Sequence, residues 1–162
     1  MESETQGLLD CLDNQRAHVL GILEGLTDGE LRQSMLPSGW AILGLVQHLA
    51  LDVERFWFRE VVAGEILPEP DNASGSAWEL SPTTRAESVL DSYRQEIKRA
   101  NVIVASTPLN AEPKMWPDFF GDWRLGDLRA VLLHVIAETA CHAGHLDAAR
   151  ELIDGRTWLK LP

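Results

Sequence analysis

Residues 132–155 read LLHVIAETACHAGHLDAARELIDG, and this stretch decides the fold class. Its apolar residues recur at steps of three and four positions, which is the period of an α-helix with one buried face. The pattern begins at about residue 125 and stops at Asp154-Gly155, where glycine favours the end of a helix. It predicts a helix over about 125–153, with an apolar side made of Leu128, Leu132, Val135, Ile136, Ala143, Leu146 and Ile153.

Three other stretches share this period, over about 4–26, 41–63 and 84–106. A short helical turn is expected over 27–32, where Thr27 and Glu30 have the spacing of a capping box. The long connections 64–83 and 109–124 are rich in Pro and Gly, and Trp78 is expected to anchor the first of them to the helices. Period-two alternation is missing over any useful length. We therefore predict an all-α four-helix bundle with long connecting loops, formed as one domain over 1–162.

The composition limits the classes of partner. Apolar residues make up 45% of the 162 residues and charged residues 24%, which is typical of a globular chain and excludes a wholly disordered one. The net charge is −11, and no cluster of Lys and Arg stands out, which argues against nucleic acid and against an anionic membrane surface as partners. No apolar run approaches the ~20 residues of a membrane span. A homodimer is left open, because bundles with exposed apolar helix faces often associate.

The two cysteines, Cys11 and Cys141, form no C-x-x-C motif, which excludes a zinc ribbon and a thioredoxin-type redox site. We expect Cys141 to be a buried, inert thiol. Two unpaired thiols suit a reducing cytoplasm, and the polar, acidic start over 1–6 does not resemble a signal peptide. The sequence therefore predicts a cytoplasmic protein.

The helix over 125–153 carries three histidines and a glutamate on one side. At ~100° per residue, His134, Glu138, His142 and His145 fall in an arc of roughly 80°. Glu138 and His142 are one turn, ~6 Å, apart, so both side chains can reach one ion. His134 is two turns, ~12 Å, from His142, which is too far for the same ion. Glu138 and His142 are the expected chelating pair, His145 is next in order, and His134 is expected in the core or behind the ligands.

The helix over 41–63 offers a further ligand, His48, inside its apolar stripe. One ligand from this helix and two from the last would make a three-ligand site with open positions, as catalytic metal sites have. Mixed imidazole and carboxylate donors suit Zn, Ni, Fe or Mn better than Ca or Mg. The same residues allow a simpler interpretation, in which His48 is a core histidine and Glu138–His142 a solvated pair. The fifth histidine, His18, is interpreted as a surface or packing residue.

Three phrases carry a resemblance to a known family: LLDCLDNQRAHVLGILEGLTDGEL at 8–31, PSGWAILGLVQHLALDVERFWF at 37–58, and the stretch over 132–155. Together they resemble the DinB-like superfamily, and most closely its actinobacterial branch of mycothiol-dependent transferases. The resemblance implies a four-helix bundle with a metal held by His48 and by the E-x-x-x-H pair Glu138 and His142. His145 occupies a place where many relatives carry glutamine, so it is expected to contact substrate or a metal-bound water rather than the metal. Cys141 replaces an arginine that many relatives carry.

The leading hypothesis is therefore a divalent-metal-dependent S-transferase that activates a low-molecular-weight thiol against a small electrophile. Mycothiol as that thiol is implied by the resemblance alone. His145 is the expected catalytic residue, because neutral imidazole can move a proton near pH 7. Two alternatives remain open at this stage: a metal-dependent hydrolase, and a non-catalytic helical binding or stress-associated protein.

Overall fold

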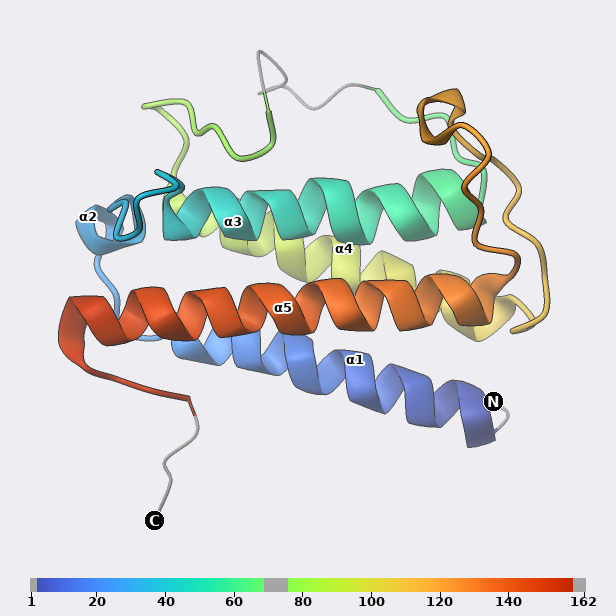
Figure 1. Cartoon of the computed structure of the whole chain (residues 1–162), viewed down its shortest axis with the longest axis horizontal. Coiled ribbons are helices and arrows are strands. Elements are labelled where there is room, and N and C mark those ends of the chain that lie inside the picture. Colours follow the sequence, from blue (N-terminus) through green and yellow to red (C-terminus); the bar gives the residue numbers. More distant parts are fainter. Residues whose placement is uncertain (1–2, 69–75, 159–162) are drawn as a thin grey trace.

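The computed structural model describes residues 3–68 and 76–158, and within these ranges the chain is all-α and has no strand (Figure 1). The predicted fold class is confirmed. The elements are α1 (Ser3–Ile22), α2 (Asp28–Leu31), α3 (Ile42–His48), which continues directly into η1 (Leu49–Val62), α4 (Ala86–Ser106), the short η2 (Asp118–Phe120) and α5 (Leu128–Asp154).

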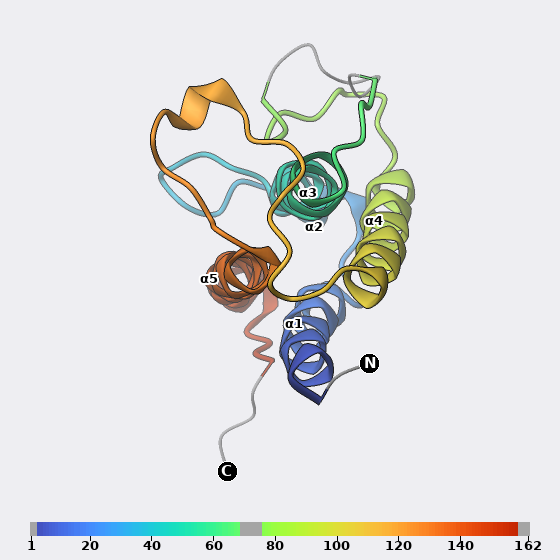
Figure 2. The same cartoon turned by 90° about the vertical axis from the view of Figure 1, so that its right-hand side faces the viewer.

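The bundle is formed by four long helices, which are α1, the continuous α3–η1 helix, α4 and α5, and Figure 2 shows them nearly end-on. α1 packs mainly against α5, and the continuous α3–η1 helix packs mainly against α4. The seam between α5 and the α3–η1 helix is less extensively packed than either of these contacts. The α1–α4 seam is packed less extensively still, so the bundle is held together mainly by its α1–α5 and α3–η1/α4 contacts.

Local chemistry explains where the helices begin and end. Asp127 caps α5 by accepting a hydrogen bond from the backbone N–H of Ala130 at 2.8 Å, and Gly155 ends it with a φ of 74°. The predicted capping box is present, because Thr27 and Glu30 exchange hydrogen bonds. α1 stops at Ile22, four residues before its predicted end, and the chain turns away through Gly25 at a φ of 84°.

The main departure from the predicted helices is that η1 is π-helical. Its last turn shows the wider hydrogen bonding: the N–H of Ala63 donates to the carbonyl of Phe58, five residues earlier, at 3.0 Å. Trp57 follows His48 by nine residues. That separation is ~2.5 turns of an α-helix, but the wider i→i+5 turn of a π-helix takes more residues, so the same nine residues make fewer turns. Both rings meet α5: His48 lies 5.0 Å from the His142 ring and Trp57 lies 4.7 Å from the His134 ring. The π form thus turns Trp57 to the same side of the helix as His48, toward α5.

The loop segment after residue 75 lies against α3. The side-chain amide of Gln47 donates to the carbonyls of Ala77 and Glu79, at 2.7 and 3.1 Å. Gly44 allows this approach, because a Cβ built there would lie 2.4 Å from the carbonyl oxygen of Trp78. Trp78 is thereby held on the bundle, as predicted, and its ring lies over the end of α3.

Gly44→Ala should therefore destabilise the protein, although alanine normally favours a helix over glycine. The added methyl group must push the backbone of Trp78 away, and overpacking of this kind costs about 1–3 kcal/mol. Urea denaturation measures the loss. Gly7→Ala in α1 is the matched control, because nothing lies within 4 Å of a Cβ there. It should raise stability by up to about 1 kcal/mol. Equal shifts in the two variants would contradict the proposed close contact.

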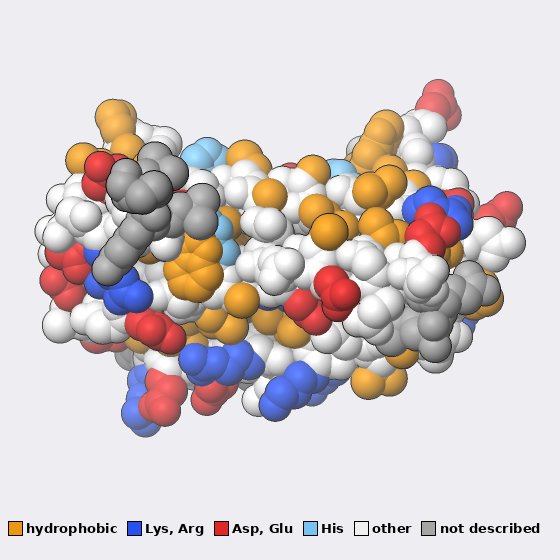
Figure 3. All heavy atoms as spheres, turned by 90° about the horizontal axis from the view of Figure 1, so that it is seen from below, with side chains coloured by type: hydrophobic (Ala, Val, Ile, Leu, Met, Phe, Trp, Pro, Cys, Tyr) orange, Lys and Arg blue, Asp and Glu red, His pale blue; other side chains and the backbone are white. Residues whose placement is uncertain are grey.

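Figure 3 shows one long face of the bundle, on which basic side chains lie beside acidic ones instead of gathering into a patch. Across the residues that the structure describes, no helix has both the length and the apolar character that a bilayer crossing needs. The expectation that nucleic acid is not a partner stays a prediction.

Candidate metal centre

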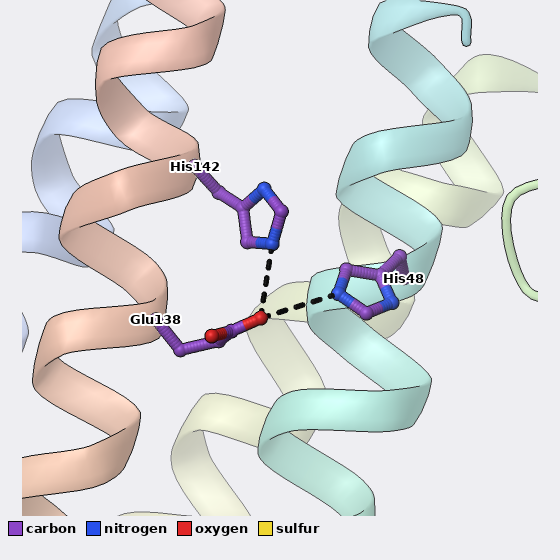
Figure 4. Close-up of side chains that lie close together, drawn as sticks. All are labelled: His48, Glu138 and His142. Atoms are coloured by element: carbon purple, nitrogen blue, oxygen red, sulfur yellow. Dashed lines mark hydrogen bonds and ion pairs between the residues drawn. The ribbon is translucent and has the colours of Figure 1, made fainter. Parts of the chain in front are cut away.

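Three ligand-type side chains converge in the seam between α5 and the α3–η1 helix (Figure 4). His48 is the last residue of α3, and Glu138 and His142 stand one turn apart on α5. One ligand atom from each lies within 4.8 Å of the other two. His142 Nε2 is 3.2 Å from Glu138 Oε1, and His48 Nε2 is 3.9 Å from the same oxygen. The structure thus brings together the three residues that helical spacing had selected.

Asp52 orients the imidazole of His48. The carboxylate Oδ2 of Asp52 lies 2.9 Å from Nδ1 of His48. An ionised carboxylate can only accept, so Nδ1 carries the hydrogen and Nε2 presents its lone pair toward Glu138. Nε2 is buried and has no hydrogen-bond partner in the described part of the chain. An unsatisfied buried polar atom is costly, and a bound cation is the partner that such a lone pair fits.

His142 is held in the form that binds a metal. Burial lowers the pKa of its imidazole and the nearby His48 ring lowers it further, against the opposing effect of the Glu138 carboxylate. The ring is therefore neutral at pH 7, as a metal-ligating histidine must be. Its Nε2 faces Glu138, while its Nδ1 lies 3.4 Å from Nδ1 of His145.

Aromatic rings cover part of this group. Trp78 stacks on His48 with ring centroids 4.3 Å apart, and it lies 5.5 Å from the His142 ring. Trp40 approaches His145 at 6.2 Å. The side chains of His48 and His142 are only 13% and 10% exposed, whereas that of Glu138 is 38% exposed. The centre is thus sheltered by the tryptophans and opens to solvent on the Glu138 side.

The remaining histidines lie apart from these ligand atoms or at their edge. His145 is exposed at the rim. His134 is half-buried and packs edge-on against Trp57 at 4.7 Å, so it lies beside the ligand-type residues and not in the core. His18, on the other side of α5, pairs with Asp147 at 2.8 Å and stacks on Trp158 at 4.9 Å, so its interpretation as a packing residue is confirmed.

The prediction of a buried Cys141 is wrong. Cys141 is exposed, as is Cys11. Cys141 points to solvent, whereas His142, the next residue on α5, is buried.

One known protein family matches nearly the whole chain. The family model described as mycothiol-S-transferase matches residues 7–155. The chain belongs to the mycothiol-S-transferase family. The matched range includes each of the three converging side chains, the whole of α3–η1, α4 and α5, and α1 from residue 7 onward. No match was found among curated proteins or among solved structures.

Two neighbours of the candidate metal centre were missed from the sequence. Asp52 follows His48 by four residues, the same spacing that identified Glu138 and His142, so the signal was available. Trp78 is 30 residues from His48 and lies in an irregular loop, so no periodic pattern could place it.

Proposed function

We propose that the protein is a divalent-metal-dependent mycothiol S-transferase that joins the sulfur of mycothiol to a small electrophile. The observation that carries this proposal is the convergence of His48 Nε2, His142 Nε2 and the Glu138 carboxylate, with His48 Nε2 buried and lacking a partner among the described residues. Membership of the mycothiol-S-transferase family supports mycothiol as the thiol.

The metal would be held by His48, Glu138 and His142, whose donor atoms are of the kinds that a divalent transition metal prefers. Two neutral imidazoles and one carboxylate suit Zn, Ni, Fe or Mn. Three protein ligands leave positions open for a thiol, in the manner of catalytic sites. When bound, the cation lowers the pKa of a coordinated thiol, so that thiolate is available at neutral pH.

The chain's own residues supply orientation, shelter and proton transfer. Asp52 fixes the ring of His48, and Trp78 keeps water from one side of it. His145 lies beside His142 at the exposed rim, where it can take up the thiol proton. The sulfur electron pair then forms the new C–S bond. With a conjugated alkene, the π pair moves toward the activating carbonyl and the adjacent carbon takes up the proton that the thiol lost. With a halide, the carbon–halogen bond breaks and the leaving group departs with its electron pair.

The test is metal-dependent consumption of mycothiol with chloroacetamide or acrylamide, with the adduct identified by mass. Protein loaded in turn with Zn, Ni, Fe or Mn should form the adduct faster than the same metal without protein. No acceleration with any of the four would contradict the proposal. Metal-dependent ester hydrolysis without loss of thiol would favour a hydrolase instead.

Asp52→Asn should weaken metal binding by about 10- to 100-fold, because loss of a partner that orients a ligating histidine costs this much. Competition with a chromophoric chelator measures the affinity. Asp147→Asn is the matched control, since it changes a second His–Asp pair, with His18, that lies outside the site. Equal metal affinities in the two variants would show that Asp52 does not orient a metal ligand.

His145→Ala should lower kcat for thiol transfer by about 100-fold, the lower range for loss of a general acid or base. It should leave metal content unchanged, since the three ligand atoms remain. Steady-state kinetics and elemental analysis of the same sample separate the two effects. Loss of metal in this variant would instead identify His145 as a ligand.

A further inference from the structure

A cluster of aromatic side chains lies at the η1 end of the seam. We define the aromatic platform as Trp57 of η1 together with Trp116, Phe119, Phe120 and Trp123 of the loop that contains η2. Its rings contact one another continuously: Trp57 stacks on Phe120 at 5.7 Å, Phe120 lies 5.1 Å from Trp123, and Phe119 lies 4.4 Å from Phe120. Figure 2 shows this loop arching outward beside the α3–η1 helix and above α5.

The platform adjoins the candidate metal centre. The ring of His134 lies 4.7 Å from Trp57 and 5.7 Å from Trp123. His134 and Glu138 are neighbours on α5, one helical turn or ~6 Å apart. On the opposite wall, the π form of η1 turns Trp57 to the side occupied by His48. Both walls of the seam thus lead from the three ligand-type residues to the platform.

Backbone hydrogen bonds hold the loop in place. The N–H groups of Lys114 and Met115 donate to the carbonyls of Val62 and Val61 at the end of η1, at 3.3 and 3.1 Å. The N–H of Trp123 donates to the carbonyl of Phe120 at 3.2 Å, and the chain turns between them at Gly121 with a φ of 57°. The rings are therefore arranged before any ligand arrives, which reduces the entropy lost on binding.

Two of the rings are exposed, which a purely structural cluster would avoid. Phe119 is 75% exposed and Trp123 is 44% exposed. Their contacts within the cluster are with other aromatic rings and with His134, and the Arg124 guanidinium lies over Trp116 at 5.3 Å. Ring faces of this kind bind flat apolar groups by offset or edge-to-face stacking. A small, flexible aliphatic group cannot stack on these rings and should therefore bind to the platform more weakly.

We propose that the aromatic platform binds the electrophilic substrate and selects electrophiles that carry an aromatic ring. This inference rests on the proposed transferase function. The ring of the substrate stacks on Trp123 and its neighbours, and its reactive carbon extends along the seam toward Glu138. With an N-aryl acrylamide, the thiol sulfur bonds to the terminal alkene carbon, the π pair moves toward the carbonyl, and the adjacent carbon takes up the proton that the thiol lost.

The test compares N-phenylacrylamide with N-propylacrylamide, which share one reactive group, as substrates with mycothiol. After correction for the uncatalysed rates, the parent protein should prefer the phenyl compound by about tenfold in kcat/KM, as expected for a stacked ring pair. Phe119→Leu/Trp123→Leu should bring the ratio close to one. Trp158→Leu, which removes an exposed indole on the far side of α5, should keep the preference. Equal kcat/KM for both compounds in the parent would overturn the proposal while leaving the transferase intact.

Binding of an unreactive analogue separates this inference from the transferase itself. Saturation-transfer NMR with N-phenylpropanamide should show contact with the parent protein and its loss in Phe119→Leu/Trp123→Leu. This outcome supports the platform as an aromatic binding site even if no thiol transfer is found. Binding that is unchanged in the double variant would overturn the proposed site.

Discussion

Replacing His48 or His142 with alanine is expected to abolish both metal binding and mycothiol transfer. Each substitution removes one of three converging ligand atoms, and the two that remain cannot hold an ion with the same geometry. Because the loss of an orienting partner alone costs about 10- to 100-fold in affinity, the loss of a ligand should cost at least about 100-fold. Isothermal titration with Zn, and adduct formation with mycothiol, measure the two effects.

His18→Ala is the control for these variants. His18 also pairs with a carboxylate and stacks on a tryptophan, but it lies outside the seam. It should keep parental metal affinity and turnover. Circular dichroism should show the same helical content in all variants. If His48→Ala and His142→Ala bind metal as the parent does, the three residues are not the ligands, and the interpretation of His48 as a core histidine gains support.

Arg16→Met should lower the free energy of unfolding by about 3–5 kcal/mol at pH 8, because it leaves a buried carboxylate without its partner. Arg16 of α1 and Glu54 of η1 are almost fully buried and form two hydrogen bonds, at 2.7 and 2.6 Å. Burial by itself lowers the pKa of the Arg16 guanidinium, but the Glu54 carboxylate raises it above its usual range. The pair, with Asn101 of α4 at 2.7 Å, fixes α1 against the rest of the bundle.

The destabilisation in Arg16→Met should be smaller at pH 5 than at pH 8. Burial raises the pKa of the Glu54 carboxyl. Without Arg16, the folded state favours the protonated form of the Glu54 carboxyl. The loss of unfolding free energy is therefore complete above the folded-state pKa of Glu54, and it declines as the pH falls toward the pKa that Glu54 has in the unfolded state. Urea denaturation at the two pH values measures it. Arg94→Met, which breaks an exposed pair with Asp91, is the control and should cost less than about 1 kcal/mol at both. A loss in Arg16→Met as small as this would contradict the role of the buried pair.

Helical period was sufficient to predict the bundle and to select the three converging residues. On α5, the spacing of Glu138 and His142 decides their proximity, because both belong to one regular helix. His48 could be placed on the core side of its helix, but only the packing of α3 beside α5 brings its Nε2 to 3.9 Å from Glu138.

The π-helical form of η1 could not be predicted. Residues 49–62 contain neither Pro nor Gly, and their apolar positions fit α and π periods alike. For the same reason the place of Trp57 beside His134 was missed, and with it the aromatic platform, whose other members come from an irregular loop. The exposure of Cys141 was also missed, since it depends on which sides of α5 the other helices cover.

The most direct test of the three-residue metal centre is the metal content of untagged protein, measured by plasma mass spectrometry beside His48→Ala and His142→Ala. We expect about one divalent transition metal ion per parent chain, and a loss of that metal in both variants. A parent protein that holds no metal, even after incubation with Zn, Ni, Fe and Mn, would contradict this expectation.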